Sequence, residues 1–222
     1  MKVLLGISGA SGAVYGVRTG ELLLSRGVDL HLVVTSTAWT LIDAELPAGA
    51  PALPARRPGG PSAGGADAPA ERGVPPDAKA RLARLMSASP DSFRLHAEDD
   101  FGIPFASGSN PPDAMIIAPC SMGMLGRIAH GVSSSVLARC ADVALKERKP
   151  LVLVPRETPL SAIHLENMLT LARAGADILP ACPGFYHRPA AVPDLVDFVV
   201  SRILARVGID ADLHPKWGEG TP

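Results

Sequence analysis

Hydrophobic residues occur along this chain in two patterns, as short continuous runs and as longer stripes at helical spacing. Four strong runs cover residues 3–7, 30–34, 114–119 and 151–154, and two weaker runs cover residues 93–97 and 176–179. Continuous apolar runs of this length are typical of strands that are buried on both faces of a parallel sheet. The chain is therefore predicted to contain up to six strands.

Helical stripes separate most of these runs. The spacing predicts helices over residues 13–26, 38–46, 78–86, 133–145, 164–174 and 194–207, with another from 120 toward 130 and a loop over 101–110. Strands that alternate with helices favour an α/β fold: a doubly wound, mainly parallel sheet with helices on both faces, Rossmann-like or flavodoxin-like, in a single domain. In such a sheet, ligands bind outside the carboxyl ends of the strands.

Small residues follow the first run, with glycines at positions 6, 9 and 12. Glycines at the end of a strand let the backbone approach a ligand, and the first N–H groups of the next helix favour an anion such as phosphate. The spacing matches neither the dinucleotide fingerprint G-x-G-x-x-G nor the P-loop. This loop is therefore either a phosphate cradle or a tight strand-to-helix turn. Loops at 35–37, 120–124 and 155–159 are predicted to face the same edge.

The composition changes at about residues 47–77, which are rich in alanine, proline and glycine and lack apolar periodicity. Such a segment buries too little apolar surface to order itself, so we expect a disordered insertion. The expected organisation is one domain over residues 1–209, interrupted at 47–77, and a C-terminal tail over 210–222.

Charge and cysteine content argue against several classes of protein. The chain has 21 Lys+Arg and 22 Asp+Glu, so it carries no basic footprint for nucleic acid. Cys120, Cys140 and Cys182 are far apart and indicate a reducing compartment. The sequence has no apolar run long enough to span a membrane, no pattern of a secretory leader and no metal-binding motif. We therefore expect a cytoplasmic protein without metal, membrane or nucleic-acid partners.

Ionisable side chains gather on or near the predicted loops. They are Arg139, Lys146, Glu147, Arg148, Arg156, Glu157, Tyr186, His187 and Arg202. Basic residues and a tyrosine beside a phosphate cradle suit an anionic substrate bound next to an anionic cofactor. Other interpretations stay open, because residues 146–148 could be a solvated helix end, Glu157 could pair with Arg156, and Tyr186 could pack in the core.

Several stretches of the sequence resemble the flavin prenyltransferases of the UbiX type. They are Gly9-Ala-Ser-Gly12, Ala118-Pro-Cys-Ser121, Arg139-x-Ala-Asp-Val-Ala-Leu-Lys-Glu-Arg148, Leu151-Val-Leu-Val-Pro-Arg-Glu-Thr-Pro-Leu160, His164-Leu-Glu-Asn-Met-Leu169 and Pro183-Gly-Phe-Tyr-His187. The two ten-residue strings are the most specific. The resemblance covers nearly the whole chain except about residues 47–91.

The resemblance implies a metal-free transferase that moves a dimethylallyl group from dimethylallyl monophosphate to reduced FMN, with bonds at flavin N5 and C6. The product, prenylated FMN, would be the cofactor of a partner decarboxylase of the UbiD type. The family also forms homo-oligomers, which implies a dodecamer. Two alternatives stay open. One is a flavoprotein decarboxylase that acts on phosphopantothenoylcysteine, although its Asn-containing Pro-x-Met-Asn motif is absent at residues 119–122. The other is a non-catalytic FMN carrier.

The resemblance also implies roles for individual residues. Those implied to hold the flavin are Gly9, Ala10, Ser11, Thr35, Ser36, Ser121, Met122, Gly123, Met124 and Arg139. Those implied to bind the prenyl phosphate are Lys146, Tyr186, Arg202 and Trp217, the last in a tail that would close over the site. The implied catalytic residues are Glu157, Lys146, Tyr186 and Glu45. A departing phosphate needs cations and a proton donor, which fits this set.

Overall fold

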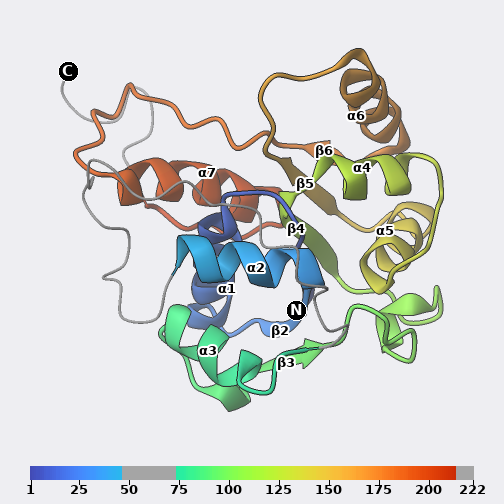
Figure 1. Cartoon of the computed structure of the whole chain (residues 1–222), viewed down its shortest axis with the longest axis horizontal. Coiled ribbons are helices and arrows are strands. Elements are labelled where there is room, and N and C mark those ends of the chain that lie inside the picture. The colour runs from blue at the N-terminus through green and yellow to red at the C-terminus, as the bar shows by residue number, and fades with distance from the viewer. Residues whose placement is uncertain (47–73, 214–222) are drawn as a thin grey trace.

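Six parallel strands form a single sheet in the order β3-β2-β1-β4-β5-β6 (Figure 1). The computed structural model describes residues 1–46 and 74–213. The strands are β1 (Lys2–Ile7), β2 (Asp29–Val34), β3 (Phe93–His96), β4 (Ala114–Cys120), β5 (Leu151–Pro155) and β6 (Asp177–Ile178). The strand order reverses between β1 and β4, so a ligand site is expected at the carboxyl ends of these two strands. The predicted doubly wound α/β fold is confirmed.

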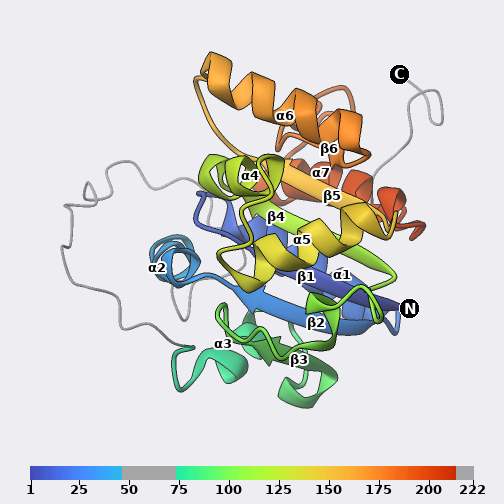
Figure 2. The same cartoon turned by 90° about the vertical axis from the view of Figure 1, so that its right-hand side faces the viewer.

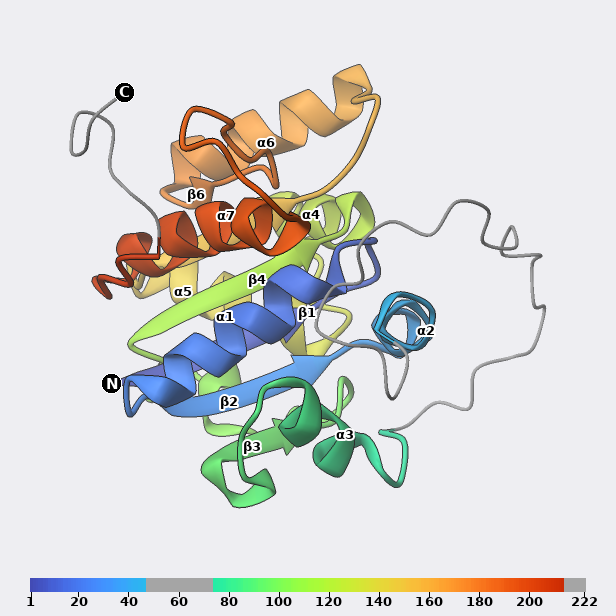
Figure 3. The same ribbon diagram turned by 90° about the vertical axis from the view of Figure 1, so that its left-hand side faces the viewer.

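Helices cover both faces of the sheet. They are α1 (Ala13–Ser25), α2 (Ser36–Glu45), α3 (Ala78–Leu85), α4 (Met122–Ala129), α5 (Val136–Lys146), α6 (Ala162–Ala174) and α7 (Val192–Arg206), with 3-10 turns η1 (Pro90–Ser92) and η2 (Pro104–Ala106). Figure 2 shows α4 and α5 in front of the sheet. Figure 3, from the opposite side, shows α1 and α7 in front, packed against each other.

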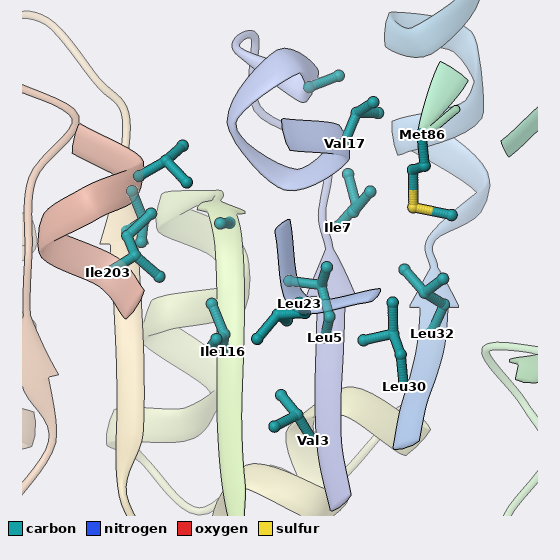
Figure 4. Close-up of a cluster of buried hydrophobic side chains, with 14 of the residues drawn as sticks. Val3, Leu5, Ile7, Val17, Leu23, Leu30, Leu32, Met86, Ile116 and Ile203 are labelled. Carbon is teal, nitrogen blue, oxygen red and sulfur yellow. The ribbon is translucent and has the colours of Figure 1, made fainter. Parts of the chain in front are cut away.

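Burial on both faces explains why the strands read as continuous apolar runs. Val3, Leu5 and Ile7 of β1 face α1 and pack in the cluster drawn in Figure 4. Leu4, between them in sequence, faces the other way and packs in a second cluster with Leu137 of α5. Alternate residues of a strand point to opposite faces, so a strand covered on both sides needs apolar residues at every position.

Two glycines shape the junction between β1 and α1. Gly12 has φ 103°, in the left-handed region that glycine adopts without strain. Gly16 lies so close to β4 that an added Cβ would collide with the backbone carbonyl of Ala118. The small residues at this junction therefore let α1 start directly beside the carboxyl ends of β1 and β4.

Helix starts account for most differences from the sequence expectations. Helix α5 begins at Val136 rather than 133, because the Ser135 hydroxyl accepts a hydrogen bond from the Ala138 N–H (3.4 Å). Helix α6 begins two residues earlier than predicted, since Ser161 and the His164 side chain form a reciprocal capping box. The segment 101–110, predicted as a loop, contains η2, whose Phe105 is 1% exposed.

Most of the predicted insertion and tail lies outside the described residues. This applies to residues 47–73 and to 214–222, which include Trp217. Among the helices that are described, none has the length and apolar character needed to cross a membrane. In residues 1–46 and 74–213, no group of three or more His, Cys, Asp or Glu side chains is arranged to hold a metal ion.

Candidate active site

A cavity of about 490 Å³ opens at the carboxyl ends of β1, β2 and β4. It is lined by Ser8, Gly9, Val34, Thr35, Ser36, Thr37, Val74, Glu98, Asp99, Ser121, Gly123, Met124, Arg127, Ser134 and Ser135. Its volume lies in the range typical of small-molecule and cofactor sites. The convergence of the loops after β1, β2 and β4, which the sequence predicts, is therefore present in the structure.

Hydroxyl groups dominate this cavity, since seven of its fifteen lining residues are serine or threonine. Three of them cap helices: Thr35 accepts from the Ala38 N–H at 3.2 Å, Ser121 from Met124 at 3.2 Å and Ser135 from Ala138 at 3.4 Å. The N-terminal ends of α2, α4 and α5 therefore meet here, and their partial positive charge favours an anion. Each capping oxygen acts as an acceptor, so its own proton can be donated to a ligand.

Ser8 fixes the spacing between two of these loops. Its hydroxyl donates to the Pro119 carbonyl at 3.0 Å and accepts from the Ser121 N–H at 2.8 Å. The side chain is 1% exposed, so loss of the hydroxyl would leave buried partners without a hydrogen bond. Ser8 therefore holds the Gly9–Gly12 loop at a set distance from the start of α4.

Three charged residues complete the wall, and the sequence did not indicate any of them. Glu98 follows β3, and its carboxylate accepts from the Ser36 N–H at 2.9 Å while its carbonyl accepts from Val136 at 3.0 Å. It thereby joins the starts of α2 and α5. Asp99 lies beside it, and Arg127 reaches the cavity from the last turn of α4. These residues come from an edge-strand loop and a helix end, whose approach depends on tertiary packing.

Glu45, at the end of α2, occupies the start of α1. Its carboxylate accepts from the Gly12 N–H at 2.9 and 3.1 Å and from the Ala13 N–H at 2.9 Å. These are the N–H groups that the sequence suggested for a phosphate. In this structure they already have an anionic partner, so Glu45, which the resemblance implies as catalytic, acts as the cap of α1.

Arg156 and Glu157 follow β5, and Arg156 contacts the Gly9–Gly12 loop. The Arg156 Nε donates to the Ser11 carbonyl at 2.9 Å, which joins the β5 loop to the β1 loop. The Glu157 carboxylate accepts from the Thr158 N–H at 3.0 Å. Among the contacts of this described loop, no ion pair joins Glu157 to Arg156. Such a pair was one of the interpretations that the sequence left open.

Tyr186 and Arg202 meet around the Phe198 ring of α7. The Phe198 ring centroid lies 5.8 Å from that of Tyr186, 5.4 Å from that of His187, on which it stacks, and 5.9 Å from the Arg202 guanidinium carbon. The loop that carries Tyr186 follows β6 and passes the end of β5, where the Ala181 N–H donates to the Pro155 carbonyl at 3.0 Å. We call Tyr186, His187, Phe198 and Arg202 the cation–aromatic cluster.

Lys146 and Arg139 reach neither the cavity nor the cation–aromatic cluster of their own chain. Lys146 ends α5 on the side of the sheet where β1 begins (Figure 2), where its Nζ binds Glu147 and lies against Gly108. The Arg139 guanidinium donates to the Ala106 carbonyl at 3.0 Å and to Asp142 at 2.8 Å. Three other residues implied to hold the flavin, Ala10, Ser11 and Met122, are likewise not among the described residues that line the cavity.

The clearest pKa shifts near the site keep side chains neutral. Burial raises the pKa of Tyr15, in the first turn of α1, and raises that of Cys120 at the end of β4 to about 12. A thiol with such a pKa is protonated at neutral pH and is a poor nucleophile.

Comparison with known proteins identifies relatives of this architecture. Residues 1–204 match the family model described as Flavoprotein. The flavin prenyltransferase UbiX of Pseudomonas aeruginosa is 44% identical, over 98% of this chain and 94% of its own length.

Two solved structures share the fold over nearly the whole chain. The crystal structure of AnUbiX in complex with FMN and dimethylallyl pyrophosphate is 33% identical, with a TM-score of 0.79 over 100% of this chain and 98% of that one. A dodecameric FMN-dependent UbiX-like decarboxylase from Escherichia coli O157:H7 is 36% identical, with a TM-score of 0.78 over 98% of this chain and 99% of that one. Taken with the site at the carboxyl ends of the strands, these matches show that the chain belongs to the flavin prenyltransferase family of flavoproteins.

Proposed function

We propose that this enzyme transfers a dimethylallyl group from dimethylallyl monophosphate to reduced FMN, with bonds at flavin N5 and C6. One observation carries the proposal: a hydroxyl-rich cavity opens at the carboxyl ends of β1, β2 and β4, and Arg156, on the loop after β5, binds the Ser11 carbonyl of the glycine-rich loop that borders this cavity. The AnUbiX complex holds both kinds of ligand, a flavin and a prenyl phosphate ester, although its prenyl ligand is a pyrophosphate.

The donor set of the cavity fits FMN. Its seven hydroxyl side chains and three helix N-termini suit a ligand that carries a phosphate, a polyhydroxyl chain and a ring with a polar edge. Thr35, Ser36, Ser121, Gly123 and Met124 would hold the flavin from this wall, and Gly9 would let it approach β1. Reduced FMN supplies the nucleophilic atoms of the reaction when it is bound.

The residues of the loop after β5 and of the cation–aromatic cluster suit the departure of a phosphate. The bond between the allylic carbon and the phosphate oxygen breaks with its electron pair on oxygen, so the negative charge on the leaving group grows. Arg156 and Arg202 would stabilise that charge, and the Tyr186 hydroxyl would donate a hydrogen bond to it. Glu157 would serve as the acid or base, because its carboxylate lies on the loop that Arg156 ties to Ser11.

Lys146 and Arg139 are proposed to act in the site of a neighbouring copy. Both lie away from the cavity of their own chain, and a related enzyme forms dodecamers. A homo-oligomer would bring the end of one α5 to the carboxyl edge of another sheet. We further propose that prenylated FMN is passed to a UbiD-type decarboxylase in the cytoplasm. The three cysteines are all free thiols, which fits a reducing compartment.

Mass spectrometry of flavin extracted after anaerobic incubation with reduced FMN and dimethylallyl monophosphate tests the proposal. We expect a product heavier than FMN by one prenyl unit, and less or none with the pyrophosphate donor. Extraction of unchanged FMN would favour a carrier. Release of carbon dioxide from a cysteine-containing substrate, with no prenylated flavin, would favour a cysteine decarboxylase.

A further inference from the structure

Arg127 is the one cation among the described residues that line the cavity, and neither the sequence nor the family resemblance singled it out. It belongs to α4, where Gly123 and Met124 precede it by four and three residues. Residues at this spacing share one face of a helix. All three line the cavity, so the α4 face from the helix start to Arg127 forms a continuous part of the wall.

The surroundings of Arg127 leave its charge free to bind a ligand. The side chain is exposed, and within the described part of the chain its guanidinium has neither an ion-pair nor a hydrogen-bond partner. One turn earlier, a Cβ added at Gly123 would meet no atom within 4 Å, so there is open space along the helix beside the arginine. Ser134 and Ser135, at the start of α5, line the same cavity.

The charge balance of the wall favours a role for this cation in binding an anionic ligand. Glu98 and Asp99 also line the cavity, and Arg127 is the described residue that offsets them. A phosphate near two carboxylates is repelled unless a cation neutralises it, and an arginine can donate two hydrogen bonds to phosphate oxygens. Helix N-termini add partial charges only, so they do not replace a full positive charge.

We propose that Arg127, together with the start of α5 at Ser134 and Ser135, binds the phosphate group of the flavin and makes the cavity selective for FMN over riboflavin. This inference rests on the proposed function, because it assumes that the cavity holds the flavin. It assigns the phosphate to the α4–α5 side of the cavity rather than to the start of α1, which Glu45 occupies.

Equilibrium titration of oxidised FMN and of riboflavin, followed by flavin fluorescence, separates the phosphate from the rest of the ligand. The wild-type protein should bind FMN more tightly than riboflavin. Arg127→Ala should weaken FMN binding by about 10- to 100-fold, as expected for loss of a charge-assisted hydrogen bond, and change riboflavin binding less than about twofold. Arg127→Lys should retain part of the preference. Arg173→Ala, at an exposed position near the end of α6, is the matched control and should change neither affinity.

Two results would overturn the inference while the proposed function stands. One is an Arg127→Ala protein that keeps the full preference for FMN. The other is an equal loss of affinity for both flavins, with an unchanged melting curve, which would place Arg127 against another part of the ligand. A wild-type protein that binds neither flavin would overturn the proposed function and this inference together.

Discussion

Replacement of Glu45 by alanine gives the most informative test of the geometry at the start of α1. The carboxylate accepts hydrogen bonds from two backbone N–H groups, at 2.9 to 3.1 Å. In Glu45→Ala these groups lose their partner, and the helix loses a negative charge at its N-terminus. Each loss alone destabilises a protein by about 0.5–2 kcal/mol.

Glu45 is half-buried, so solvent compensates part of the loss, and we expect the free energy of unfolding to fall by about 1–2 kcal/mol. For a chain of this size that corresponds to a fall in melting temperature of about 2–8 °C. Urea unfolding followed by circular dichroism measures the change. Glu45→Gln keeps one acceptor oxygen without the charge and should lose about half as much.

Glu166→Ala is the matched control, because Glu166 is an exposed carboxylate in the middle of α6. It should change the free energy of unfolding by less than about 0.5 kcal/mol. Equal stability of Glu45→Ala, Glu166→Ala and the parent protein would refute the contact between Glu45 and α1. The N–H groups of Gly12 and Ala13 would then be free for a phosphate, as the sequence first suggested.

Three further predictions concern pH, thiol reactivity and catalysis. Burial lowers the pKa of both His31 and His96, whose rings share a 2.8 Å contact, so the unfolded chain binds these protons more tightly. The free energy of unfolding should therefore fall as pH drops below about 6.5, by up to about 1.4 kcal/mol per pH unit and group. Replacing both His31 and His96 by asparagine should flatten this pH dependence, whereas the control His130→Asn should not. Iodoacetamide should label the exposed Cys182 in the native protein and leave Cys120 and Cys140 unmodified. Equal labelling of all three cysteines, measured by peptide mass spectrometry, would contradict the burial of Cys120 and Cys140. Glu157→Gln should bind both ligands but turn over about 10²–10⁴-fold more slowly, and parental turnover would move the acid–base role to Tyr186.

The strands could be predicted from sequence because the burial of a strand leaves its pattern in consecutive residues. A strand covered on both faces must be apolar at each position, and β1, β4 and β5 show this as uninterrupted runs. Helix starts were less certain, because they depend on single capping contacts. Ser135 and the pair of Ser161 and His164 set the starts of α5 and α6, and a stripe of apolar residues does not report them.

The site was predictable where its residues follow a strand or begin the helix after it. Thr35 and Ser121 follow β2 and β4, so the rule for carboxyl ends places them correctly at the cavity. Arg127 lies at the end of a helix, and Glu98 follows the edge strand, so packing rather than sequence brings them there. Lys146 does not line the cavity of its own chain, since a helix that returns along a parallel sheet carries its last residue to the opposite edge of the sheet.

The central claim, that the flavin and the prenyl phosphate bind on two sides of the Gly9–Gly12 loop, is tested most directly by a crystal structure of this enzyme with FMN and the prenyl donor. The claim predicts flavin density in the hydroxyl-rich cavity, with its phosphate beside Arg127. It also predicts the donor phosphate among Arg156, Tyr186 and Arg202. Flavin density over the cation–aromatic cluster, or a donor phosphate inside the hydroxyl-rich cavity, would contradict it.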